Sequence, residues 1–149
     1  MVIETQPRVV HGIDLDRVEA AIRSAERRTS GQIRVAVARF YFWGDVRRAA
    51  ETAFARLGMH RTRRRNGVLL YLAPKRRRFA VIGDTGVHER VTDTFWSRIS
   101  KMLEAELHAG DLTAGLEHAI ASIGERLAEH FPPDPHDTNE LPDRVEIER

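Results

Sequence analysis

The sequence contains no cysteine, which excludes disulfide bonds, thiolate metal ligands and a cysteine nucleophile. It also has no apolar run near the roughly 18 residues that span a bilayer, and its first residues lack the basic and apolar segments of a secretory signal. We therefore expect a cytoplasmic protein that does not itself span a membrane. The 149 residues, 42% hydrophobic and 31% charged, are typical of one globular domain, and we expect a monomer.

The small net charge of +2 is unevenly distributed along the chain. Residues 134–149 contain six acidic and two basic residues, a net of −4, which leaves +6 for residues 1–133. This basic bias favours anionic ligands, but it is too weak to indicate nucleic acid. We divide the chain into an N-terminal extension (1–11), a single domain (12–133) and an acidic C-terminal tail (134–149). Free solvation is the default for a tail of this composition, and docking onto the basic domain is the open alternative.

The hydrophobic pattern predicts the element order αβαββαα. Apolar residues recur at helical spacing over 15–25, 46–57, 91–107 and 112–127, with Asp14 and Asp45 at the starts of the first two helices. Strands are predicted over 32–38, 68–73 and 79–82, and the second is apolar throughout, as in a central strand covered on both faces. The fold class is therefore α/β, with a small mixed sheet between helices.

The stretch Gly83-Asp84-Thr85-Gly86 directly follows the third predicted strand. An Asp-Thr-Gly triplet after a strand is the form that an aspartic-protease site takes, but that chemistry needs two aspartates that share one proton. This chain has one copy, and the triplet leads into a helix rather than into an almost wholly β framework. Asp84 therefore needs another explanation.

The strand directions predict which loops share an edge of the sheet. The first two strands are joined through a helix and should be parallel, while the tight turn after the second makes the third antiparallel. The starts of the first two strands then meet the end of the third. The ligand-binding candidates at that edge are Ser30, Gly31, Arg65, Asn66, Gly67, Gly83, Asp84 and Thr85, with Asp84 and Asn66 as candidate metal ligands.

Each of these candidates also has a purely structural explanation. The glycines can serve turns, Asp84 can cap the helix that follows, and His88 can be a solvated side chain. Two basic runs, 60–65 and 75–78, are separated by a strand of about 20 Å and cannot form one patch. The aromatic run 40–43 lies near the second, and we expect it to pack under a loop or against a protein partner rather than on nucleic acid.

Several blocks in a fixed order resemble the TPM domain family, in particular its small bacterial branch without a membrane anchor. The residues that carry the resemblance run from about 12 to 143 and comprise 26–35, Leu57-Gly58-Met59, 65–71, 79–84, Phe95-Trp96, His130-Phe131-Pro132 and 139–143. The resemblance implies a three-layer α/β/α sandwich, Rossmann-like in arrangement. The wider family includes a plant thylakoid protein with described acid phosphatase activity and calcium binding, and a nematode auxiliary protein of acetylcholine receptors. Bacterial members often occur beside LemA-type membrane proteins.

Two departures from the family pattern remove carboxylates from the candidate edge. Many members have glutamate where this chain has Gln32, and aspartate where it has Arg65. Calcium usually takes six to eight oxygen ligands, several of them anionic, so Asp84 with Asn66, Thr85 and waters would form only a weak calcium or magnesium site. Arg65 in turn favours phosphate or carboxylate.

Two functions therefore compete. The first is a non-catalytic or weakly catalytic binding module that serves assembly or maintenance of a membrane-protein partner, LemA-type or another TPM protein, with a weak divalent-cation or phosphate site. The second is a metal-dependent acid phosphatase acting on phosphomonoesters, with a cation at Asp84, Arg65 neutralising the phosphoryl charge and His88 as an acid. We favour the binding module, because the spacing shows no nucleophile with a base and an orienting group.

Overall fold

A four-stranded mixed sheet forms the centre of the protein, whose computed structural model describes residues 8–39, 44–135 and 140–148. The strands, in the spatial order β5-β4-β3-β6, are β3 (Gln32–Ala38), β4 (Gly67–Ala73), β5 (Arg78–Gly83) and β6 (Glu146–Glu148). Strand β3 runs parallel to β4 and β6, whereas β5 is antiparallel to β4. The three predicted strands and their directions are confirmed. A two-stranded sheet of β1 (Val9–Val10) and β2 (Ile13–Asp14) precedes the first helix.

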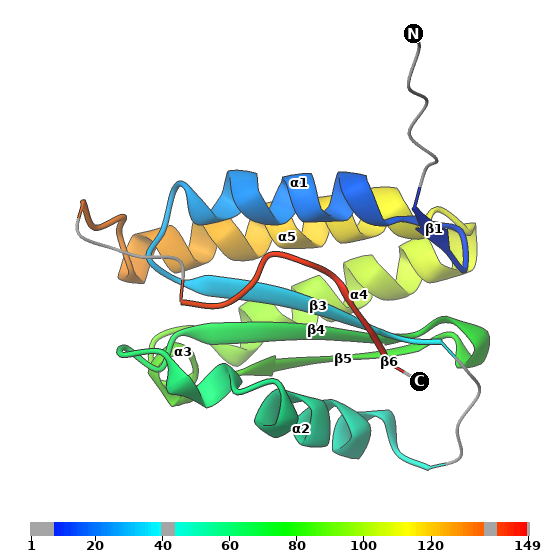
Figure 1. The fold of residues 1–149 in the computed structure, drawn as a ribbon, viewed down its shortest axis with the longest axis horizontal. Coiled ribbons are helices and arrows are strands. Elements are labelled where there is room, and N and C mark those ends of the chain that lie inside the picture. The colour runs from blue at the N-terminus through cyan, green and yellow to red at the C-terminus, as the bar shows by residue number, and fades with distance from the viewer. Residues whose placement is uncertain (1–7, 40–43, 136–139, 149) are drawn as a thin grey trace, which may run out of the picture.

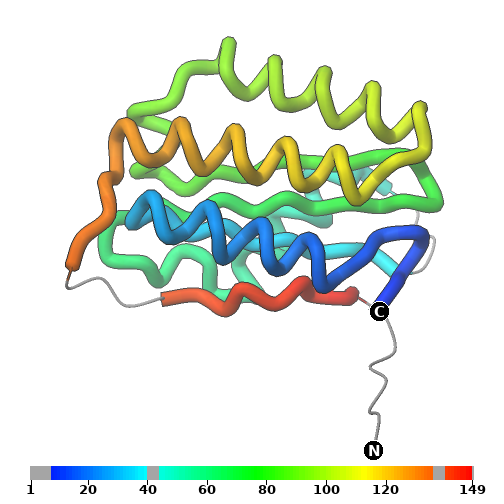
Figure 2. Tube along the Cα trace, turned by 90° about the horizontal axis from the view of Figure 1, so that it is seen from above, coloured from blue at the N-terminus to red at the C-terminus, as the bar shows by residue number. Residues whose placement is uncertain are grey.

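Helices cover both faces of the sheet and give the three layers of an α/β/α sandwich (Figure 1). Seen from above in Figure 2, α1 (Leu15–Glu26), α5 (Leu112–His130) and α4 (Asp93–Ala109) lie side by side over one face. Helix α2 (Val46–Arg56) covers the other face, and the single turn α3 (Thr85–His88) follows β5. In the part of the chain described, no helix is long and apolar enough to cross a membrane.

The ends of the helices follow from local sequence. Asp14 caps α1 by accepting a hydrogen bond from the backbone N–H of Arg17, and Asp45 caps α2 in the same way from that of Arg47. Gly58 follows α2 with a φ of 68°, which glycine adopts without the steric cost that other residues incur. Both predicted N-caps are confirmed.

Successive side chains of the strands point to opposite faces of the sheet, so the hydrophobic core has two parts. On the side of α1, α4 and α5, the largest group includes Ile33, Val35 and Leu70, together with Ile22 and Ile120 from the helices. The core on the α2 side is smaller, and α2 contributes only Ala50 and Ala53 to its buried residues. The strands contribute the residues that alternate with those of the main core. The buried members are Ala36, Ala38, Ala50, Ala53, Met59, Leu69, Tyr71, Ala73 and Leu141. Every residue of β4 is buried, as its apolar run predicts.

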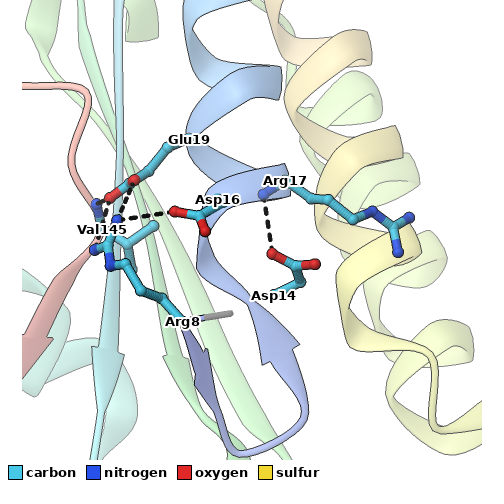
Figure 3. A network of polar contacts seen from close by, with 6 residues as sticks. All are labelled: Arg8, Asp14, Asp16, Arg17, Glu19 and Val145. Carbon is cyan, nitrogen blue, oxygen red and sulfur yellow. Dashed lines mark hydrogen bonds and ion pairs between the residues drawn. The ribbon is translucent and has the colours of Figure 1, made fainter. Parts of the chain in front are cut away.

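The acidic C-terminal segment packs on the domain, so the expectation of a free, solvated tail is wrong for residues 140–148. Leu141 and Val145 are buried, and β6 pairs with the edge of β3. Figure 3 shows how Glu19 of α1 holds this segment: its carboxylate accepts a hydrogen bond of 3.0 Å from the backbone N–H of Val145 and pairs with Arg8 at 2.7 Å. The acidic composition of the segment predicted solvation, but its apolar residues Leu141 and Val145 are buried against the domain, and this burial stabilises the docked segment.

Candidate functional site

The starts of β3 and β4 and the end of β5 meet at one edge of the sheet, as predicted. Gln32 lies opposite Gly67, and Val68 lies opposite Gly83. The end of α5 returns to this edge, where the carbonyl oxygen of Phe131 accepts a hydrogen bond from the backbone N–H of Ser30 at 2.9 Å. The loops that carry the candidate residues are therefore neighbours in space.

Asp84 is fully engaged in contacts within the chain. Its Oδ1 accepts a hydrogen bond of 2.7 Å from the backbone N–H of Thr85, so that it caps α3. Arg65 donates to both oxygens of the same carboxylate, from Nε to Oδ2 at 2.8 Å and from Nη2 to Oδ1 at 3.0 Å. These hydrogen bonds and the charge of Asp84 raise the pKa of Arg65. The bidentate pair ties the loop before β4 to the end of β5.

Gly86 allows the two loops to approach this closely. Its N–H donates to the carbonyl oxygen of Arg65 at 2.9 Å. A Cβ atom at this position would lie 2.3 Å from the carbonyl oxygen of Arg64 and 2.7 Å from that of Arg65. The glycine therefore serves packing between segments of the chain rather than the approach of a ligand.

The remaining candidates are divided between the interior and the surface. Gly31 is buried against Leu127, whose Cδ1 would lie 2.8 Å from an added Cβ. Gly67 is the first residue of β4 and pairs with Gln32 of β3, and Gly83 is the last residue of β5 and pairs with Val68 of β4. His88 and Thr85 are exposed at the two ends of α3.

A small polar pocket of about 80 Å³ lies at this edge. It is lined by two residues predicted for the site and by four others, namely Ser30, Asn66, Arg63, Arg64, Asp134 and Glu140. The guanidinium of Arg64 lies 3.5 Å from both the Ser30 hydroxyl and the Asp134 carboxylate. Glu140 accepts a hydrogen bond of 3.1 Å from the backbone N–H of Arg63.

Asn66 is the buried polar residue of the pocket, with 1% of its surface exposed. Its Nδ2 donates to the carbonyl oxygen of Ser30 at 3.2 Å, and its backbone N–H donates to the Thr62 hydroxyl at 3.1 Å. Its Oδ1 has no hydrogen-bond partner among the described residues. A buried acceptor left in this state costs about 1–3 kcal/mol, which makes this atom a point where a ligand would stabilise the protein.

Sequence reasoning missed Asp134 and Glu140 as site residues, because both belong to the segment that it treated as a solvated tail. One signal was available, since the block 139–143 belongs to the family resemblance and contains Glu140. The described ranges hold no cluster of three or more His, Asp or Glu side chains that could bind a metal ion. The predicted aromatic surface at 40–43 lies outside the described residues.

Comparisons with known proteins give one family and one consistent fold. A family model described as the TPM domain matches residues 7–126. The chain is similar to the BA42 protein of the psychrophilic bacterium Bizionia argentinensis, with 34% identity and a TM-score of 0.83 over 89% of this chain and 91% of that one. No curated protein matches significantly.

Two more distant solved structures share the fold. The N-terminal domain of protein cg2496 from Corynebacterium glutamicum has 16% identity and a TM-score of 0.58, with coverage of 87% of this chain and 75% of that chain. An N-terminal domain from P. gingivalis has 18% identity and a TM-score of 0.64, with coverage of 78% and 76%. The three-layer arrangement therefore recurs at low sequence identity.

Proposed function

This chain belongs to the TPM domain family, and we propose that it is a cytoplasmic, non-catalytic binding module with a weak divalent-cation site in the pocket beside Asn66. The observation that carries the proposal is the buried Oδ1 of Asn66, which lacks a partner among the described residues. A cation or a hydrogen-bond donor in the pocket would satisfy it. Family membership supports the fold far better than it supports a reaction, so the function is argued from the site.

A cation suits the pocket better than phosphate does. The oxygen groups of the lining are Asn66 Oδ1, the Ser30 hydroxyl and the carboxylates of Asp134 and Glu140, which are hard oxygens of the kind that calcium and magnesium take as ligands. A phosphate would be attracted by the exposed side chains of Arg63 and Arg64, but it would also face the two carboxylates and the Asn66 amide oxygen, all of which repel it. The oxygen groups of the pocket therefore favour a cation.

Arg64 already supplies a positive charge to part of this oxygen set. Its contacts to Ser30 and Asp134 are long, 3.5 Å each, and half of its side chain is exposed, so it can move aside at little cost. Four side-chain ligands fall short of the six to eight oxygens that calcium prefers, and water would complete the shell. The expected affinity is consequently weak, on the order of 1 mM.

The phosphatase alternative assigns Asp84 to the metal and Arg65 to the phosphoryl group. In the structure these two side chains bind each other in a bidentate pair, so each neutralises the other. His88 is exposed at the end of α3. This arrangement supports a structural role for Asp84 and favours the binding module.

The test is a titration of the labelled full chain with calcium and then magnesium, followed by amide spectra at neutral pH. We expect saturable shifts at Ser30, Arg64, Asn66 and Glu140, and weaker binding in Glu140→Gln, which removes one anionic ligand. Asp84→Asn is the matched control, since it also removes one carboxylate at the same edge and should leave the cation affinity unchanged. Absence of shifts at about ten times the expected dissociation constant would refute the site.

The same protein samples can be assayed to distinguish the binding module from the phosphatase. We expect no turnover of p-nitrophenyl phosphate with either metal. Metal-dependent turnover that is lost in Asp84→Asn, with the fold intact, would establish the phosphatase in place of the binding module.

A membrane protein of the LemA type or a second TPM protein is the partner class that we propose for the module. Co-expression of this chain with such a protein, followed by purification of the complex, tests it directly. Loss of the complex in Asn66→Ala but not in Asp84→Asn would connect the partner to the pocket. A failure to co-purify with either class would contradict the partner and leave the cation site to its own titration.

A further inference from the structure

A second, larger groove lies at the opposite end of the sheet from the Asn66 pocket. It has a volume of about 340 Å³ and is lined by His11, Pro74, Lys75, Arg77, Leu107, Gly110 and Leu112. These residues come from three separate places: the turn between β1 and β2, the turn η2 (Pro74–Arg76) that joins β4 to β5, and the junction of α4 with α5. Figure 1 shows the three places together at the end of the molecule marked by β1.

Two cations stand on the rim of this groove. Lys75 and Arg77 are exposed, and neither side chain forms an ion pair with a carboxylate among the described residues. Arg77 has a φ of 52°, which closes the turn through a hydrogen bond of 3.0 Å from its N–H to the Pro74 carbonyl oxygen. The turn therefore presents both cations from a defined backbone.

Apolar side chains form the other part of the lining. Pro74, Leu107 and Leu112 are all half-buried. Leu112 packs against the main core, whereas Leu107, which helical spacing predicts to face the core, lies at the groove instead. An apolar surface flanked by unpaired cations favours a ligand that combines carboxylates with an apolar side chain.

Two acidic residues adjoin this lining in the sequence, Glu106 beside Leu107 and Asp111, and Glu106 is not among the residues that line the groove. Asp111, between Gly110 and Leu112, caps α5 by accepting a hydrogen bond of 3.1 Å from the backbone N–H of Ala114. It does not itself line the groove. The charged residues of the lining are therefore basic, and an anionic ligand meets complementary charge there.

We propose that this groove binds an acidic peptide segment of a partner protein, in which carboxylates flank an apolar side chain. The carboxylates would pair with Lys75 and Arg77, and the apolar side chain would cover Leu107 and Leu112. A planar anionic bilayer fits less well, because its headgroups can contact the exposed cations while its apolar interior stays away from the half-buried Leu107 and Leu112. The groove is separate from the Asn66 pocket, so the two proposals can fail independently.

The test titrates a short peptide of alternating glutamate and leucine into the isotope-labelled full chain. We expect saturable amide shifts at His11, Lys75 to Arg77 and Leu107 to Leu112, and affinity that falls as salt is added. Reversal of both rim cations, Lys75→Glu with Arg77→Glu, should weaken binding by roughly tenfold, because two attractions become repulsions. The matched control is Arg27→Glu with Arg28→Glu, which makes the same change in net charge at exposed positions away from the groove and should leave the affinity unchanged.

Two further peptides separate the charged and apolar contributions. A glutamate–serine peptide should bind several-fold more weakly, and a lysine–leucine peptide should not bind. Equal affinity for the serine and leucine peptides would overturn the apolar part of the proposal. Absence of shifts with the acidic peptide, an equal loss in the control variant, or binding of phosphatidylserine vesicles without binding of the peptide would overturn the proposal as a whole.

Discussion

Asp84 shows how one residue can attract a functional interpretation and yet serve the fold. Its position after a strand and before glycine suggested a ligand at the edge of the sheet, and the structure gives its carboxylate three donors, all from neighbouring parts of the chain. The capping role that the sequence allowed is confirmed. Arg65 was predicted to favour an anionic ligand at this edge, and in the structure it binds the carboxylate of Asp84 instead.

The cap and the ion pair of Asp84 can be separated by substitution. Asp84→Ala should lower the free energy of unfolding by about 1 kcal/mol more than Asp84→Asn, because asparagine retains the cap on α3 and alanine does not. The ion pair itself should contribute less, since half of Arg65 is exposed and exposed pairs are worth about 0.2–1 kcal/mol. Urea denaturation of the two variants measures both terms. Equal costs for the two substitutions would show that the ion pair, rather than the cap, holds the loop.

Gln32 illustrates the opposite case, in which the sequence indicated a loss and the structure shows a use. Relative to the family pattern, glutamine removes a carboxylate from the candidate edge. In the structure its Oε1 accepts a hydrogen bond of 3.1 Å from the backbone N–H of Leu141. The side chain thus helps to hold the C-terminal segment, a role that only the position of that segment could reveal.

Among the elements, the contact of α1 with α5 depends on a glycine. A Cβ atom at Gly124 would lie 2.8 Å from the Cβ of Ala25, closer than real side chains approach. The two helices lie side by side over the same face of the sheet (Figure 2). Their packing is therefore close to backbone contact at this point.

Substitution of Gly124 by alanine has two opposing effects on stability, a gain in helix propensity and a loss from overpacking. Gly124→Ala should gain about 1 kcal/mol of propensity within α5, but overpacking in a dense core costs about 1–3 kcal/mol. We expect a net loss of stability in thermal unfolding, because the Cβ of Ala25 is attached directly to the backbone of α1 and cannot move away without moving that helix. The double variant Gly124→Ala with Ala25→Gly removes the clash and serves as the control. If Gly124→Ala alone raises the melting temperature, the helices are less closely packed than the structure indicates.

In strand β6, the acidic residues of the C-terminal segment contribute to its docking on the domain. Its acidic residues Glu146 and Glu148 pair with Arg34 and Arg56, while Val145 and Ile147 pack against the main core. Burial lowers the pKa of Arg34, and the charge of Glu146 acts against this effect. A basic residue on an interior strand is thus balanced by an acid from the far end of the chain.

At the scale of the whole molecule, residues 140–148 connect both cores with the Asn66 pocket. Leu141 belongs to the core on the α2 side, Val145 to the main core, and Glu140 lines the pocket. The basic bias of residues 1–133 and the acidic bias of the remainder are consistent with this docking. The segment completes the sheet by adding its outer parallel strand.

The contribution of this segment to stability can be measured at Leu141, of which 6% is exposed. Leu141→Ala should lower the free energy of unfolding by about 2 kcal/mol or more, because it leaves a cavity in the small core on the α2 side. Arg144→Ala, an exposed change in the same segment, should stay within about 0.5 kcal/mol. Urea denaturation compares them. An unchanged midpoint in Leu141→Ala would restore the picture of a solvated tail.

The sequence by itself determined strands β3, β4 and β5, their directions and the edge at which their loops meet. These features follow from the local hydrophobic period and from the kind of connection between successive strands, a helix between β3 and β4 and a tight turn between β4 and β5. Only the tertiary structure decided the pairing of Arg65 with Asp84, the docking of β6 and the entry of Asp134 and Glu140 into the pocket. Those contacts join residues far apart in the chain, such as Gln32 with Leu141, and depend on how whole elements pack rather than on any local pattern.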